Sequence, residues 1–325
     1  MYRLDKIDKK IMIIMSENPT ISYTNLGKLI GLTKNTAKIR LDRLLEQVIY
    51  QVAPEINYKK LNLSEYAIFL KCNLTSAKKT QFHKWLIKHK NAHWVMDLFG
   101  NWDYYIEFIC KDIFEFDEAI QDMIKFLGNS FLNFETHIYA ENMKNHELLQ
   151  ELTADVDFKY KFKWPVPKDS QIHIDSIDKK ILFLLCQNGR MQHYKIATKV
   201  GVTLPTVTNR IKKMLQAGTI LRFGAYMHFA RMGYSKTLIL IKMNHYSLAQ
   251  KQQLKKWFGN EIHTKLVSRV ANTNELITYV SFQTPRALEA YIHDLRKNFS
   301  SIIKDVTILR VVDEIKLNFF PKGLL

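Results

Sequence analysis

The sequence has few of the residues that build disulfide frameworks, zinc sites and membrane spans. Its 325 residues include three cysteines, Cys72, Cys110 and Cys186, with no CxxC spacing, and each stands in an apolar stretch. Buried thiols in a reducing cytosol explain this pattern better than disulfides or zinc. The longest apolar runs, such as 237–241, fall far short of the ~20 residues that a membrane span needs. We therefore expect a cytoplasmic protein without membrane association.

Motifs of the common enzyme classes are also missing. The sequence contains no GxGxxG, no Walker-type phosphate loop and no HExxH. His83, His89 and His93 lie close together but lack a fourth partner, so surface helix residues explain them better than a metal site. We therefore expect no catalytic residues, no metal and no cofactor, and we expect that the chain is not an enzyme.

The chain does have enough apolar residues for packed cores, and it has a large excess of positive charge. Hydrophobic residues make up 47% and aromatic residues 12% of the sequence, and its length suits two to four domains. The net charge of +17 is typical of a protein that meets polyanions.

The chain is a tandem duplication that has since diverged. When the sequence is shifted by 170 positions, the segment beginning at Leu4 aligns with the segment beginning at Ile174. A one-residue shift near Val48 then sets Gly100 against Ala271 and Asp103 against Asn274. The paired identities include Asp5/Asp175, Asp8/Asp178, Ile11/Ile181, Gly31/Gly201, Thr33/Thr203, Thr36/Thr206 and Arg40/Arg210.

Each copy opens with the pattern of a helix-turn-helix unit. Apolar residues at helical spacing are followed by a turn, a short second helix that ends at Gly31 or Gly201, and a third helix. Thr33 and Thr203 are good N-caps for that third helix. The β-prone runs 48–52 and 219–223 come next and are consistent with wings.

The second half of each copy predicts the order βαββαβ, which is that of a ferredoxin-like sandwich. Copy one also carries an insertion at about 142–157, predicted as a short amphipathic helix plus linker, and then a strand-like run at 158–163. The predicted fold is α+β, with two winged helix-turn-helix domains alternating with two ferredoxin-like domains. The predicted boundaries are 1–62, 63–141, 142–171 for insertion, strand and linker, 172–233 and 234–325.

The positive charge gathers in the two helix-turn-helix blocks. Residues 1–62 carry a net charge of +5 and residues 172–233 carry +8, out of +17 for the chain. Neutralising DNA phosphates is the use that this distribution indicates.

The third helix of such a unit enters the major groove of double-stranded DNA, with its N-terminal residues nearest the bases. Copy one offers charged and amide side chains there, whereas copy two offers Leu204, Pro205 and small polar groups, so the two helices should read different sequences. Arginines and lysines further along are predicted to hold phosphates. The predicted DNA-binding residues are Ser22, Thr33, Lys34, Asn35, Thr36, Lys38, Arg40, Arg43, Thr203, Thr206, Thr208, Asn209, Arg210, Lys212 and Lys213.

Several of these residues have structural alternatives. Arg40 and Arg210 are also placed to pair with Asp8 and Asp178. Thr33 and Thr203 are helix caps first and phosphate ligands second.

The sequence resembles the leucine-responsive regulator/AsnC (Lrp/AsnC) family of transcription factors. The resemblance is carried by Leu4-Asp5-x-x-Asp8-x-x-Ile11, Gly31-Leu32-Thr33 and Arg40-x-x-Arg43-Leu44, with Asp175-x-x-Asp178-x-x-Ile181, Gly201-Val202-Thr203 and Arg210 in copy two. Gly100-x-x-Asp103 resembles the family's turn between the middle strands of the second domain.

This resemblance implies an amino-acid-responsive (RAM) type for both ferredoxin-like domains. It implies that these domains pair through their sheets, here as a pseudo-dimer within one chain, with possible further homo-oligomers. It also implies a small effector such as an amino acid, with Gly100 and Asp103 as the effector-binding residues. Copy two has Ala271 and Asn274 there, so we expect only copy one to sense a ligand.

Two other functions stay open at this point. Siroheme decarboxylases resemble the same two-domain plan, and His93 and His263 lie near the second strand of each domain. The run of histidine, asparagine and tyrosine expected after them is missing. An architectural DNA-binding protein of low sequence specificity is the other alternative. The alternating Tyr160, Phe162 and Trp164 fit either single-strand stacking or, as we favour, an edge strand with one buried face.

Overall fold

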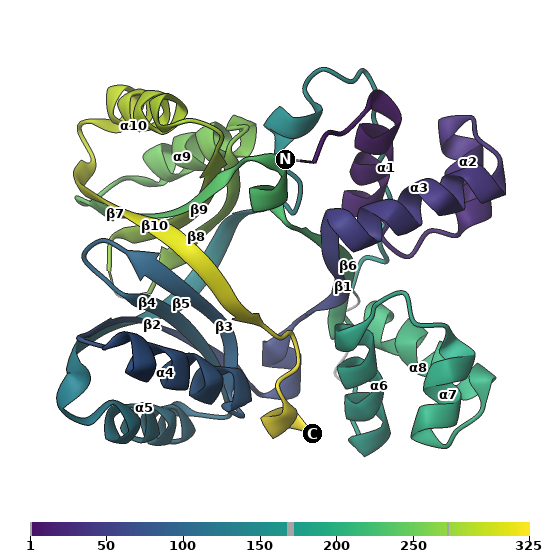
Figure 1. Ribbon diagram of the computed structural model, residues 1–325, viewed down its shortest axis with the longest axis horizontal. Helices are drawn as coiled ribbons and strands as arrows, with labels where there is room; N and C mark the ends of the chain where they lie inside the picture. Colours follow the sequence, from purple (N-terminus) through teal and green to yellow (C-terminus); the bar gives the residue numbers. More distant parts are fainter. Residues whose placement is uncertain (1, 168–171, 272) are drawn as a thin grey trace.

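The structure is a computed structural model, which describes residues 2–167, 172–271 and 273–325. Two trihelical units lie beside a β-barrel (Figure 1). The first comprises α1 (Lys6–Glu17), α2 (Tyr23–Ile30) and α3 (Lys34–Gln47). The second comprises α6 (Ser176–Gln187), α7 (His193–Val200) and α8 (Leu204–Gln216).

The second helix of each unit ends at the predicted glycine, and the third begins at the predicted threonine cap. Asp5 and Asp175 each form a capping box with the aspartate three residues on, which satisfies amides at the starts of α1 and α6. Gly31 and Gly201 end α2 and α7 in the left-handed region, with φ of 72° and 77°. The glycine therefore permits the tight turn that sets the third helix across the second.

The two runs predicted as wings pair with each other. β1 (Ile49–Ile56) and β6 (Ile220–Met227) form one antiparallel two-stranded ribbon between the copies, with Val52 opposite Ala225. The pairing partner of each strand thus comes from the other copy. One end of the ribbon packs under the first trihelical unit and the other end under the second.

The remaining strands form one closed eight-stranded barrel, in the order β10-β3-β4-β2-β5-β8-β9-β7. The two sheets join because each copy's long last strand leaves its own sheet and pairs with the other. β5 pairs with β2 up to Ile138 and with β8 from Tyr139 onward, and β10 pairs with β7 and then with β3. The bounds are β2 (Ser64–Cys72), β3 (Ala92–Phe99), β4 (Tyr104–Cys110), β5 (Phe131–Asn145), β7 (Ser235–Met243), β8 (Thr264–Val270), β9 (Glu275–Phe282) and β10 (Ile303–Leu317).

Helices cover the outside of the barrel, and side chains fill its inside. The outer pairs are α4 (Ser76–Lys88) with α5 (Ile113–Leu127) and α9 (Leu248–Asn260) with α10 (Pro285–Phe299). Inside, residues such as Phe69, Met96 and Leu309 from both copies form an apolar core. The predicted α+β class, with helix-turn-helix and ferredoxin-like βαββαβ units alternating along the chain, is confirmed. Within the described ranges, every helix is too short or too polar to cross a bilayer.

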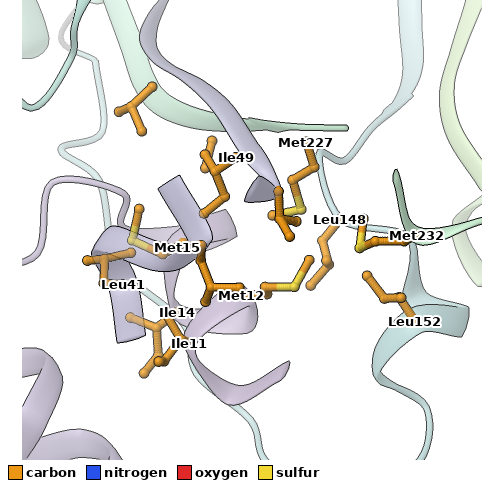
Figure 2. Close-up of a cluster of buried hydrophobic side chains, with 14 of the residues drawn as sticks. Ile11, Met12, Ile14, Met15, Leu41, Ile49, Leu148, Leu152, Met227 and Met232 are labelled. Carbon is orange, nitrogen blue, oxygen red and sulfur yellow. The ribbon is translucent and has the colours of Figure 1, made fainter. Parts of the chain in front are cut away.

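The region after the first βαββαβ unit differs from its prediction. β5 continues to Asn145, the only helical turn that follows in the described part of 142–167 is a short 3-10 turn at Gln150–Thr153, and 158–167 has no strand. Leu148 and Leu152 pack against α1 in the first helical core (Figure 2). The predicted amphipathic helix and edge strand are therefore wrong, because the polar residues after Ala140 find a strand partner in β8 of copy two.

Aromatic residues of 158–164 instead bridge the two trihelical units. Phe158 and Tyr160 pack on the core of the first unit, whereas Trp164 packs on the core of the second. The Trp164 indole N–H donates to the Glu17 carbonyl at 3.0 Å. The alternation thus reflects packing along a strap, and it does not produce a strand.

Candidate nucleic-acid interface

The N-terminal residues of α3 form an exposed polar surface. Lys34, Asn35, Thr36 and Lys38 are exposed, while Ala37 turns inward to the core. Lys38 also pairs with Asp42 at 2.7 Å across one helical turn. The structure therefore brings the predicted base-reading residues of copy one onto one solvent-facing surface.

The matching surface of α8 is different in chemistry. Leu204 is 47% exposed at the start of the helix, and Pro205 beside it is exposed as well. Thr208 lies 3.1 Å from the His193 ring nitrogen, and Asn209 is exposed with no partner among the described residues. The two helices thus present unlike groups at equivalent positions.

The predicted threonines and serine act as helix caps. Thr33 and Thr203 accept hydrogen bonds from the backbone amides of Thr36 and Thr206, at 3.2 and 3.3 Å. Ser22 caps α2 by accepting from the amide of Asn25 at 3.2 Å. These three residues are exposed, so they cap the helices while remaining accessible to solvent.

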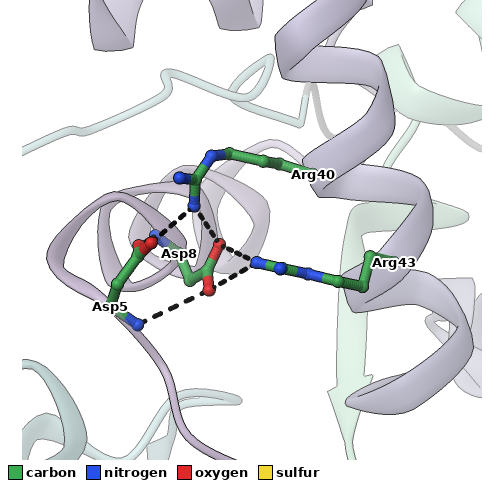
Figure 3. A network of polar contacts seen from close by, with 4 residues as sticks. All are labelled: Asp5, Asp8, Arg40 and Arg43. Atoms are coloured by element: carbon green, nitrogen blue, oxygen red, sulfur yellow. Dashed lines mark hydrogen bonds and ion pairs between the residues drawn. The ribbon is translucent and has the colours of Figure 1, made fainter.

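The predicted phosphate-binding arginines are held in ion pairs. Arg40 lies 2.7 Å from Asp5 and 2.9 Å from Asp8, and Arg43 lies 2.8 Å from Asp8 (Figure 3). Asp8 is 1% exposed, so it is a buried charge that these guanidinium groups compensate.

Copy two repeats this arrangement. Arg210 lies 2.8 Å from Asp175 and 2.9 Å from Asp178. The Asp178 amide, together with Arg210, holds the pKa of Asp175 below its ordinary value. Arg40 and Arg210 therefore pair with Asp8 and Asp178, as the structural alternative for these two arginines predicted. Lys212 and Lys213 are the exposed basic residues of α8.

The predicted effector residues form a turn whose groups are already used. Gly100 has φ of 146°, and a Cβ there would come within 2.9 Å of the Leu309 side chain. Asp103 accepts from the Cys72 amide at 2.8 Å and lies 3.3 Å from Lys71. The turn thus fastens β3–β4 to β2 and β10.

Sequence reasoning missed the contact between the two trihelical units. The Arg190 guanidinium donates to the carbonyl oxygens of Pro19 and Ile21, the latter at 3.0 Å, and lies over the Tyr23 ring. The Gly189 amide donates to the Val52 carbonyl at 2.6 Å. The only signal in the sequence was that copy one has Thr20 where copy two has Arg190. The contact therefore joins the second trihelical unit to the α1–α2 turn and to β1 of copy one.

A cavity of about 280 Å³, which the sequence did not predict, lies where the barrel opens toward the β1–β6 ribbon. Glu65, Glu107, Lys236, Lys265 and Glu314 are among its lining residues. The signal was present, because Glu107 is a lone charged residue inside an otherwise apolar strand. His93 also lines the cavity, whereas His263 lies outside it beside Glu151, at 3.1 Å.

Family models match both helical units. An AsnC-type helix-turn-helix domain matches residues 4–45, and a winged helix-turn-helix DNA-binding domain matches residues 174–220. An uncharacterized HTH-type transcriptional regulator of Pyrococcus furiosus is 27% identical over 37% of this chain and 80% of its own length. The HTH-type transcriptional regulator LrpB of Bacillus subtilis is 32% identical over 39% of this chain and 83% of its own length.

The chain belongs to the Lrp/AsnC family. Since these two relatives align over most of their own length and about two-fifths of this chain, each corresponds to one copy of the duplication. The predicted function as a DNA-binding transcription regulator is confirmed by these relatives and by both family models.

One expectation is contradicted. The crystal structure of the siroheme decarboxylase NirDL matches with a TM-score of 0.66 and 10% identity, over 98% of this chain and 96% of that chain. The prediction that the chain is not an enzyme is contradicted by this match, because an enzyme has the same fold over nearly the whole chain. At such low identity the match shows the fold alone.

Proposed function

We propose that this Lrp/AsnC regulator binds a double-stranded DNA site made of two dissimilar half-sites. The observation that carries the proposal is the difference between the exposed starts of α3 and α8. Lys34 and Asn35 present charge and a bidentate amide, whereas Leu204 and Pro205 present apolar surface. Lysine and asparagine suit guanine and adenine edges, and apolar groups suit a thymine methyl.

The fixed relation between the two units supports a composite site. The ribbon joins the units through paired backbone, and Arg190 donates to the α1–α2 turn of the other unit. Two helices held in this way contact half-sites at one preferred spacing, as a dimer does.

The test of DNA contact uses lysines rather than arginines, because Arg40 and Arg210 support the fold. Binding of mixed-sequence duplex DNA is measured by fluorescence anisotropy across a salt series for Lys34→Ala, for Lys212→Ala/Lys213→Ala, and for Lys84→Ala on α4 as the control. Each lost phosphate contact should reduce the slope of log K against log salt by about 1. Equal slopes for all variants and the wild type would reject α3 and α8 as the contact surface.

We also propose that the protein responds to a small effector such as an amino acid. We propose in addition that it assembles beyond the single chain. Gly100 and Asp103 support the effector response through the turn that they form between β3 and β4. Hydrogen exchange with and without amino acids tests it, since we expect protection at residues 100–103 of copy one and none at the equivalent positions of copy two. Equal protection of these two segments would contradict it.

Porphyrin chemistry is a second candidate function, favoured by one observation besides the fold. His93 lines the barrel cavity and is 6% exposed. An absorbance titration with an iron porphyrin tests it, because ligation by a histidine shifts the main absorption band and His93→Ala would abolish the shift. No shift in the wild type would rule this candidate out.

A further inference from the structure

The cavity at the mouth of the barrel has two sides with opposite electrostatic character. On the copy-two side, Lys236 pairs with Glu314, and the Tyr279 and Tyr50 hydroxyls donate to the same carboxylate at 3.4 and 3.1 Å. Each charge on this side thus has a partner of the opposite sign or a hydroxyl donor.

On the copy-one side, Glu65 stands where copy two has Lys236. Glu107 pairs across from Ala67 on β2, as Tyr279 pairs across from Leu238 on β7. The duplication has therefore placed two carboxylates where the other copy has a lysine and a tyrosine.

These two carboxylates form no ion pair among the described residues, and Lys59, which also lines the cavity, acts on Glu65 only through its charge, which lowers the pKa of that carboxyl. The ion pairs around the cavity join Arg222 to Glu55, Lys265 to Glu147 and Lys236 to Glu314. Among the described residues, no ion pair includes Glu65 or Glu107. Glu107 is 5% exposed, and its one recorded hydrogen bond comes from the Tyr105 hydroxyl at 3.3 Å.

Two further groups at this wall lack a partner for hydrogen bonding. Trp94 lies opposite Glu107 on the neighbouring strand, and its indole N–H is buried without an acceptor. The His93 ring lies with Nδ1 2.8 Å from the Asn318 carbonyl, so Nδ1 carries the proton and Nε2 is left as an acceptor. The wall therefore offers three acceptor groups and one donor.

Burial explains why an occupant of opposite charge would be held strongly. Burial, with the charge of Glu55 in addition, raises the pKa of Glu65 to about 7, and burial together with Glu65 raises the pKa of Glu107 well above its ordinary value. An unpaired buried carboxylate costs several kcal/mol, which a cation placed between the two would offset.

We propose that the cavity binds a small primary ammonium compound that carries a hydrogen-bond acceptor beside its cation, as an amino acid or an amino alcohol does. The ammonium group lies between Glu65 and Glu107, with His93 Nε2 within reach, and the acceptor receives the Trp94 indole N–H. A volume of about 280 Å³ lies just below the usual range for ligand cavities, which suits a molecule of this size. The site is separate from the turn of Gly100 and Asp103, and the inference rests on the cavity and not on DNA binding.

The test is made on the full chain without DNA, so its result is independent of the proposed DNA site. Thermal unfolding is measured with each of the common amino acids and with 2-aminoethanol, and with the matched compounds in which hydrogen replaces the ammonium group. We expect a concentration-dependent rise in Tm with at least one ammonium compound and none with its deaminated analogue.

Isothermal titration calorimetry with that compound then tests the residues. Glu65→Gln and Glu107→Gln keep the side-chain size and should each weaken binding by about tenfold or more. Glu118→Gln, an exposed carboxyl on α5, should leave it unchanged. Because binding removes protons from the two carboxyls, the wild-type enthalpy near neutral pH should depend on the buffer, and that dependence should shrink in the variants.

Two outcomes would overturn the inference. One is that no ammonium compound binds the folded protein at millimolar concentration. The other is that binding persists with unchanged affinity and buffer dependence in both glutamine variants.

Discussion

At the scale of single residues, Asp8 stabilises the first helical unit. It caps the start of α1 and holds Arg40 and Arg43 while being almost fully buried. Asp8→Ala should lower the free energy of unfolding by about 3 kcal/mol, because the change leaves two guanidinium groups without their shared partner.

Urea unfolding followed by circular dichroism measures this change. The matched control is Asp155→Ala, whose carboxylate is 57% exposed and pairs with Lys9, and whose loss should leave the free energy of unfolding nearly unchanged. Equal costs for the two variants would contradict a structural role of Asp8.

Glu65 and Glu107 should make the stability of the fold depend on pH. Their pKa values are raised in the folded protein above those of the unfolded chain, so the folded state binds more protons at intermediate pH. Stability is therefore highest below the ordinary carboxyl pKa and is lost as pH rises through the folded value, which for Glu65 is about 7.

Tm measured from pH 5 to pH 8 tests this sign. Over that range the free energy of unfolding of the wild type should fall by roughly 2–3 kcal/mol more than that of Glu65→Gln/Glu107→Gln, and its Tm should fall accordingly. Parallel pH profiles for the two proteins would show that the carboxyls are solvated or paired in solution.

At the scale of elements, the sequence predicts what is local. Thr33 and Thr203 cap the helices they were expected to cap, because a cap depends on neighbours three residues away. The βαββαβ order followed from the change of hydrophobic period for the same reason.

The sequence does not predict which strands pair between the copies. The runs 48–52 and 219–223 were expected to be separate wings, yet they pair with each other. The final strands extend past their predicted ends because β8 and β3 offer partners from the other copy. The sequence did not predict the cavity for the same reason, because the strands that form its walls meet only when the barrel closes.

The contact made by Arg190 should affect how tightly the protein binds a duplex that contains both half-sites. Arg190→Ala removes two donors to carbonyl oxygens of the other helical unit, so the two units should be less firmly related. Affinity for a duplex with both half-sites should fall by about tenfold, whereas affinity for a single half-site should change little.

Anisotropy titrations with the two duplexes measure the difference, and a spacing series provides the control. The variant should tolerate an added base pair between the half-sites better than the wild type does. An equal loss on the single half-site would mean that Arg190 acts on one unit alone.

At the scale of the whole molecule, the duplication places two Lrp/AsnC units in one chain, and their strands close one barrel between them. Because the copies are covalently joined, their surfaces were free to diverge without losing their pairing. The divergence appears at both ends of the molecule, in Lys34 against Leu204 on the recognition helices and in Glu65 against Lys236 inside the barrel.

The proposed function requires that this chain reads an asymmetric DNA site. Selection of bound sequences from a random duplex library, followed by sequencing, measures it most directly. We predict a consensus of two unlike half-sites at a fixed spacing, and Lys34→Ala should relax only one of them. A consensus with two-fold symmetry would contradict the claim, and the absence of any consensus would indicate an architectural DNA-binding protein instead.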